Sequence, residues 1–148
     1  MQQMQTLDVQ KNDLEIHPVD EKTKVRILRW LINDIKLISN QLNFTNLLHD
    51  FPKYCRNGVL FGDLINRLRG REEVIKGIHR APKNLTAITA NFDKVLGYVK
   101  QFPRFSSRYL WAKDKAIEGN ADVIWGFIDD IWHWHFNKIS LHDPAHKQ

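Results

Sequence analysis

Apolar side chains recur every three or four residues in four stretches of the sequence, the spacing at which they share one face of an α-helix. These stretches cover residues 22–35, 59–68, 85–99 and 121–136. None of them shows the sustained alternation of a β-strand, and the Asn-Gly pair at 57–58, a common hairpin signal, is followed by a helical pattern. The pattern therefore predicts an all-α fold with four main helices and short helices between them.

Residue types that begin and end helices support these boundaries. Aspartate, asparagine and threonine favour the N-cap position because their side-chain oxygens accept hydrogen bonds from free backbone amides. The expected N-caps are Asp20 or Thr23, Asn57, Asn84 and Asn120. Gly70 follows the second stretch, where a left-handed residue is favoured, and Gly119 is expected to end a short turn over residues 115–118.

Two segments between the periodic stretches are expected to lack a regular helix. A short apolar turn over residues 47–51 precedes Pro52. Because proline has no amide donor and disfavours helix in the residue before it, we expect Pro52 to interrupt this turn. Residues 71–83 have little periodicity and predict a long connection.

The apolar stripes also predict which side chains form the core. The last stretch has a wide aromatic face, which is typical of a helix that is deeply embedded in its domain. Trp125, Trp132 and Phe136 lie beside this face, and we expect Trp134 and Phe136 to be partly exposed. The residues expected in the core are Trp30, Leu60, Leu64, Phe92, Leu96, Ile124, Trp125, Ile128 and Ile131.

Length and composition are those of one globular domain. The 148 residues, 43% hydrophobic and 26% charged, can bury a core without a disulfide or a structural metal. We expect the domain over residues 21–139, a flexible lead over 1–20 and a frayed tail over 140–148. No apolar run is long enough to span a bilayer, and the polar start does not resemble a signal peptide. With Cys55 as the only cysteine, the sequence predicts a cytoplasmic protein.

Charge is distributed unevenly and predicts an acidic partner. Residues 1–21 carry five acids and one base, residues 22–115 carry 19 bases and seven acids, and residues 116–148 carry five acids and two bases. The net charges of −4, +12 and −3 sum to +5. A basic middle attracts acidic surfaces and makes association sensitive to salt. The candidate binding residues are Lys22, Lys24, Arg26 and Arg29 in the first helix, and Lys94, Lys100, Arg104, Arg108, Lys113 and Lys115 further along.

The sequence contains few residues arranged for catalysis or for binding a metal or cofactor. His133 and His135 are two residues apart in a helical pattern, so they point to different sides and do not converge on a metal ion. Asp129 and Asp130 are adjacent and do not face each other as an acid–base pair. Neither a phosphate-binding loop nor a dinucleotide fingerprint is present. Residues 101–111 could stack on nucleobases, but we expect their aromatics to anchor a loop to the core, which makes nucleic acid an unlikely partner. We therefore expect no catalysis, no cofactor and no metal.

Three landmarks, in order and at suitable spacing, carry a resemblance to a known family. Trp30 stands in KTKVRILRWLIND among basic and apolar residues. NGVLFGDLINRL, residues 57–68, is similar to a segment Asp-Gly-Val-Leu-Leu-x-x-Leu-Ile-Asn, with Asn57 in place of the aspartate. AIEGNADVIWGFIDDIWHW, residues 116–134, is similar to a Gly-Asn pair followed by a helix with Ile-Trp. Over residues 23–137 the chain resembles a calponin-homology domain.

The resemblance implies a compact bundle of four principal helices that binds other proteins of the cytoskeleton. Asn84 and Asn91 stand where the family commonly has asparagines. Members often bind F-actin, frequently as tandem pairs, some single domains bind microtubules, and others bind neither. The resemblance places filament contacts on the first helix and the last helix. Our first hypothesis is therefore an actin-binding module that uses the basic first helix.

Two features of the sequence weaken the actin hypothesis and keep alternatives open. Only one domain is present, and the last helix carries Asp122, Asp129 and Asp130, which would face an acidic filament unfavourably. One alternative is a single domain that binds tubulin through its cations, as in a cilium or centriole-type cytoskeleton. The other is a protein–protein adaptor that binds neither filament.

Overall fold

The fold is entirely α-helical over the residues that the structure, a computed structural model, describes, namely 18–70, 73–106 and 108–140. No strand forms within these ranges, so the predicted all-α class is confirmed. Most of the expected tail and most of the expected lead lie outside the described residues, whereas Ser140 is the last residue of the final helix. The helices are α2 (Glu21–Arg29), the π-helical turn η1 (Trp30–Asp34), α3 (Phe44–Cys55), α4 (Val59–Arg69), α5 (Leu85–Val99), α6 (Lys113–Ile117) and α7 (Ala121–Ser140).

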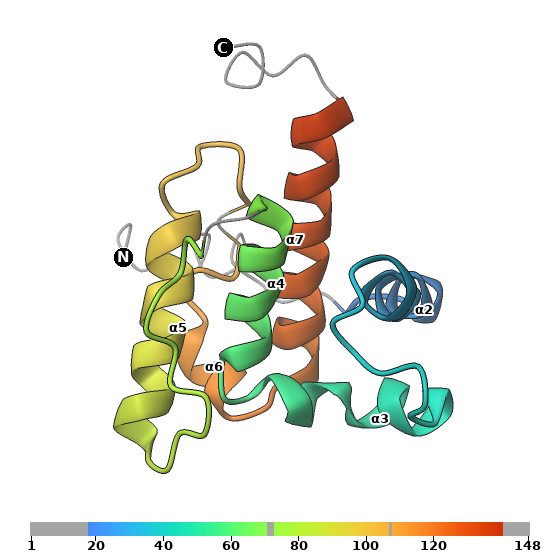
Figure 1. Ribbon diagram of the computed structural model, residues 1–148, viewed down its shortest axis with the longest axis horizontal. Helices are drawn as coiled ribbons and strands as arrows, with labels where there is room; N and C mark the ends of the chain where they lie inside the picture. The colour runs from blue at the N-terminus through green and yellow to red at the C-terminus, as the bar shows by residue number, and fades with distance from the viewer. Residues whose placement is uncertain (1–17, 71–72, 107, 141–148) are drawn as a thin grey trace, which may run out of the picture.

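Helix α7 is the centre of the arrangement. It contacts α2, α3, α4 and α6, while α5 packs against α4 and α6. In Figure 1, α4, α5 and α7 stand upright, α2 lies beside α7 and is seen nearly end-on, and α3 runs across the lower right, below α2. Because α7 is covered from several sides, every residue of Val123–Ile128 is buried, as the wide aromatic face predicted.

Aromatic rings fill the core around α7. The rings of Phe51 and Trp125 lie 4.5 Å apart between centroids, and Phe61 lies 5.0 Å from Phe127. Eight of the nine residues expected in the core are buried, and only Leu60 stays partly exposed. The expectation that Trp134 is partly exposed is wrong, because rings from the segment after α5 cover it and leave it 5% exposed. Phe136 is partly exposed as expected.

Three of the expected N-caps form as predicted. Asp20, Asn84 and Asn120 each accept a hydrogen bond from the backbone amide three residues ahead, at 2.8, 2.8 and 3.1 Å. Helix α4 differs, because its N-cap is Gly58 at φ 81°, while Asn57 accepts from the amide of Val59 at 3.0 Å. A Cβ on Gly58 would lie 2.9 Å from that of Asn91, so glycine permits both the left-handed conformation and the close approach.

Helix α3 corrects the expectation for Pro52. The helix runs through Pro52 to Cys55, and it begins after Asn43, whose side chain accepts from the amide of Asn46 at 2.9 Å. Proline removes one backbone hydrogen bond from a helix, but here its ring is buried beside the core residue Phe51. Burial of apolar surface offsets the lost bond, a contribution that local sequence rules do not include.

The first helix was expected to continue to Ile35, but it is a regular α-helix only as far as Arg29. From Trp30 the backbone widens into a π-helical turn, in which the amide of Ile35 donates to the carbonyl of Trp30 at 2.9 Å. Lys36 follows with φ 59°, which is uncommon for a residue other than glycine. Single π-turns are rare and occur frequently at functional sites. The apolar spacing did not reveal this turn, in which Trp30 and Leu31 are both buried.

Two asparagines fix the connection between α4 and α5. Its described part forms no helix, as expected, and buries Ile75. The side chain of Asn66 accepts from the amide of Ile75 at 2.7 Å and donates to its carbonyl at 3.0 Å. Asn91 binds both backbone groups of His79 in the same way, at 2.8 and 3.0 Å.

Candidate functional site

The groups that could perform chemistry are dispersed or already paired. His133 is half exposed and lies 3.4 Å from Asp129, whereas the ring of His135 packs beside Trp30. Burial raises the pKa of the Cys55 thiol well above its ordinary value, which disfavours the reactive thiolate. Across the described ranges, no three histidine, cysteine or acidic side chains come together as a metal site.

The basic residues of the first helix fall into two pairs. Lys22 and Arg29 are exposed, and the guanidinium of Arg29 lies 5.0 Å from the ring of Phe44. Lys24 and Arg26 instead contact the neighbouring helix, since the Lys24 ammonium lies 5.7 Å from the ring of Trp125 on α7. We therefore expect only Lys22 and Arg29 to offer charges whose reversal leaves the α2–α7 contact intact.

Arg26 ties α2 to α7 through two interactions. Its Nη2 lies 2.9 Å from Oδ1 of Asp129, and its guanidinium carbon lies 4.0 Å from the centre of the Trp132 ring. A guanidinium at this distance from a tryptophan ring is attracted by the ring's negative face. Arg26 thus places an aromatic side chain of the last helix next to the basic face of the first.

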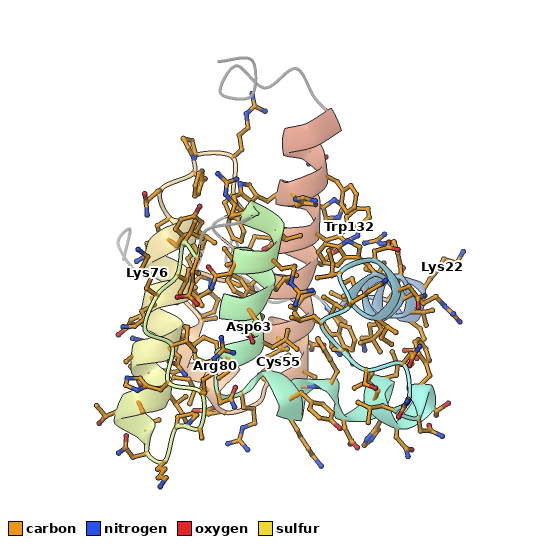
Figure 2. All side chains as sticks on the ribbon, in the orientation of Figure 1. Lys22, Cys55, Asp63, Lys76, Arg80 and Trp132 are labelled. Atoms are coloured by element: carbon orange, nitrogen blue, oxygen red, sulfur yellow. The ribbon has the colours of Figure 1, made fainter. Side chains whose placement is uncertain are left out.

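A shallow groove of about 430 Å³ runs between α2–η1 and α7, and we call it the α2–α7 groove. Figure 2 shows Lys22 pointing outward from α2 and Trp132 on the side of α7 that faces α2. The π-helical turn contributes Asn33 and Asp34 to the lining of the groove. Its cationic lining residues are Lys22, Arg26 and Arg29, and its apolar lining residues are Val25, Trp30 and Trp132.

The second set of candidate cations does not form one surface. Arg108 is paired with Asp130, and Lys113 lies 2.8 Å from Asp93. Lys100 and Lys113 share a hollow with Trp111, but two acids line it as well. Lys94 does not line this hollow and lies beside Gly77. Arg104 and Lys115 are exposed. Internal acids therefore pair with two of these six cations, Arg108 and Lys113.

The acids of the last helix are not presented to a partner as we expected. Asp129 is 15% exposed at its side chain and pairs with Arg26, and Asp130 is 4% exposed. Of the three aspartates, only Asp122 lacks an ion pair within the described part of the chain, and it is partly buried. The electrostatic objection to an acidic partner at α7 is consequently weaker than the sequence suggested.

Asp130 is a buried carboxylate with an incomplete set of partners. Oδ1 accepts from Nη2 of Arg108, while Oδ2 accepts no hydrogen bond from the described residues. Burial raises the pKa of Asp130 to about 6, an effect that the pairing with Arg108 opposes but does not cancel. The pair fixes the segment around Arg108 on α7.

This raised pKa predicts that Asp130 contributes more to the stability of the fold at pH 5 than at pH 7. The folded state binds the proton on the Asp130 carboxyl more tightly than the unfolded state does. The stabilisation that this proton gives is therefore fully present below about pH 4 and is lost as the pH rises through about 6. Between pH 5 and pH 7 the loss amounts to roughly 1 kcal/mol. Urea unfolding of the wild type and of Asp130→Asn at pH 5 and at pH 7 measures this loss of stability. Equal pH dependence in the two proteins would show that another group is responsible.

Sequence reasoning found the cations of the groove but missed its aromatic wall. Trp132 was placed only beside the buried face of the last helix. Its contact with Arg26 joins residues that are 106 positions apart, and no local pattern reports such a contact. A signal was nonetheless present, since Trp132 and Phe136 are four residues apart and therefore lie on one side of a helix.

Comparison of the chain with protein-family models, with curated proteins and with solved structures found no match. Among the described helices, none combines the length and the apolar character that crossing a membrane requires.

Proposed function

We propose that this chain is a calponin-homology-type domain that binds an acidic protein surface, the actin filament, without catalysing a reaction. The α2–α7 groove is the observation that carries the proposal. It combines exposed cations with apolar and aromatic side chains, which is the composition of binding surfaces that attract an acidic partner and then exclude water.

The packing of the three landmark stretches supports the family part of the proposal. The Trp30 ring lies 6.0 Å from that of Phe136, and α2 contacts α7. Helix α4, which carries the second landmark, also contacts α7. The three stretches thus pack together in one helical bundle, and a compact helical bundle is what the resemblance implies.

The position of the cations supports a role for α2 in the first encounter. Lys22 and Arg29 are exposed and belong to no ion pair among the described residues. Exposed charges attract a partner over about 8–10 Å at physiological salt, so we expect filament affinity to fall as ionic strength rises. Trp132, partly exposed on the same groove, provides apolar surface that a bound partner could cover. Tubulin is also acidic and remains the alternative partner.

Parallel co-sedimentation with F-actin and with microtubules tests the proposal. We expect the wild type to pellet with F-actin, and Lys22→Glu/Arg29→Glu to bind roughly tenfold more weakly or worse because two attractions become repulsions. Lys24 and Arg26 stay unchanged, since their reversal would disturb the α2–α7 contact. Thermal unfolding should show that the variant remains folded.

A control variant with the same net charge separates a local effect from a general one. Lys76 and Lys83 are exposed in the connection before α5, and Figure 2 shows Lys76 on the opposite side of the molecule from Lys22. Lys76→Glu/Lys83→Glu should pellet like the wild type. Pelleting with microtubules alone would make tubulin the partner, and pelleting with neither filament would contradict filament binding. Equal loss in both variants would remove α2 as the site.

A further inference from the structure

The residues that precede α2 carry the charge that complements the α2–α7 groove. Residues 1–17, which lie outside the described part of the chain, contain three acids and one base. Apolar residues stand among the acids, and Leu14 and Ile16 flank one of them directly. The acids are Asp8, Asp13 and Glu15. The segment therefore combines negative charge with apolar side chains, which is the composition that a basic and partly apolar groove attracts.

The groove has charge left for such an occupant. Lys22 and Arg29 line it, are exposed and belong to no ion pair among the described residues. The guanidinium of Arg29 lies 5.0 Å from the ring of Phe44, an uncharged neighbour that does not neutralise it. Asp34 is the one acid of the lining, against three cations of which only Arg26 has its own acidic partner. The groove thus keeps a positive excess.

The exposed cations are arranged in a row along α2. They are seven residues apart, which is about two helical turns and roughly 10 Å along the helix axis, so they stand on one side of the helix. Val25 lies between them in the lining, and Trp132 of α7, partly exposed, forms the opposite wall. A segment that runs along α2 in this groove would meet a cation, an apolar stretch and a second cation in turn.

Residues 8–17 are placed to run along this row. The described chain begins at Pro18, immediately before α2 and next to the end of the helix that carries Lys22. Ten extended residues reach up to about 33 Å, whereas Arg29 lies about 16 Å along the chain axis from Pro18. After a turn at Pro18, the acids of the segment can therefore reach both exposed cations. Because the segment is covalently attached, its effective concentration at the groove is in the millimolar range, and a weak attraction is enough to hold it there.

We propose that residues 8–17 dock in the α2–α7 groove of their own chain and exclude an acidic partner from it. The acids pair with Lys22 and Arg29, and the apolar residues between them cover Trp132. The consequence for the filament rests on the proposed function, since it requires that the filament binds at this groove. A groove that is occupied for nine-tenths of the time binds its partner about tenfold more weakly.

A nitroxide spin label on Gln10→Cys tests the docking in the full chain without any filament. Cys55 is fully buried, so the label attaches to the new thiol. The label broadens the NMR signals of groups close to it, and we expect the indole signal of Trp132 to lose intensity. Lys22→Glu/Arg29→Glu should restore this intensity, because the acids of the segment would then be repelled from the groove.

Filament pelleting tests the exclusion of a partner. Asp8→Asn/Asp13→Asn/Glu15→Gln removes three negative charges from the segment and should bind F-actin about threefold to tenfold more tightly than the wild type. The matched control removes three exposed acids elsewhere and gives the same net charge, so it should bind like the wild type apart from the effect of net charge. Its substitutions are Glu73→Gln, Asp114→Asn and Glu118→Gln.

The remaining outcomes decide against the proposal in distinguishable ways. Lys76→Glu/Lys83→Glu lies away from the groove, and an equal indole intensity in it and in the α2 double variant would rule out docking at Lys22 and Arg29. A loss of intensity that disappears on dilution would assign the segment in the groove to a second copy. Filament binding by the neutralised segment no tighter than in its control would rule out exclusion of the filament. Pelleting with neither filament would contradict the proposed function alone, because the NMR measurement of docking requires no filament.

Discussion

Replacing Asn91 with alanine should lower the free energy of unfolding by about 3 kcal/mol. The side chain is fully buried and makes three hydrogen bonds to the backbone. Its Oδ1 accepts from the amide of His79 at 2.8 Å, and its Nδ2 donates to the carbonyls of Asn57 and His79 at 2.8 and 3.0 Å. Alanine would leave these three backbone groups without their partner, and unsatisfied buried groups cost about 1–3 kcal/mol each.

Urea unfolding of Asn91→Ala beside Asn46→Ala provides the measurement. Asn46 is exposed on α3, so its replacement should change stability by less than about 0.5 kcal/mol. Asn91→Asp is a sharper variant, because the carboxylate can still accept from His79 but would face two carbonyl oxygens. It should therefore be least stable at neutral pH and recover in part as the pH falls and the carboxyl takes up a proton. A loss below about 1 kcal/mol in Asn91→Ala would contradict this account.

Replacing Gly126 with alanine should destabilise the protein by about 2 kcal/mol, although the same change inside a helix ordinarily stabilises it. A Cβ at position 126 would lie 2.4 Å from Cζ and 2.5 Å from Oη of Tyr109. The Tyr109 ring is rigid and only 3% exposed, so it cannot turn away into solvent. The clash would displace the segment that carries Arg108 from α7, and with it the pairing to Asp130.

Gly97→Ala is the matched control, because it lies inside α5 and no atom of a neighbouring element lies within 4 Å of the place that its Cβ would occupy. For Gly97→Ala we expect the free energy of unfolding to rise by up to about 1 kcal/mol, the ordinary effect of this change inside a helix. A double-mutant cycle with Tyr109→Ala adds a second check. Once the ring is removed, alanine at position 126 should no longer be harmful, so the two changes should be strongly non-additive. Equal stabilisation by Gly126→Ala and Gly97→Ala would refute the steric argument.

The helices and most of their starts could be predicted because they depend on residues close together in the sequence. An apolar stripe repeats every three or four residues, and the caps at Asp20, Asn84 and Asn120 act on amides three positions ahead. Where a distant contact outweighed a local rule, prediction failed. Pro52 lies inside α3 with its ring buried, and the N-cap of α4 is Gly58, which lies against Asn91, and not Asn57.

The candidate site was predicted only in part for the same reason. Lys22 and Arg29 are exposed cations of an amphipathic helix, and their exposure follows from the stripe on its other side. Whether the other cations are available to a partner depends on acids far along the chain, since Arg26 forms an ion pair with Asp129 and Arg108 forms one with Asp130. The aromatic wall of the α2–α7 groove likewise arises between elements that no local pattern relates.

By itself, the sequence determined the all-α class, the helical stripes, three of the capping residues and the excess of positive charge in the middle of the chain. Only the tertiary structure decided which cations stay available to a partner, which tryptophans are covered and where apolar surface is left open. The physical reason is that periodicity and capping act over one helical turn. Ion pairing, ring packing and hollows depend on distances in space, which are set only when the helices pack around α7.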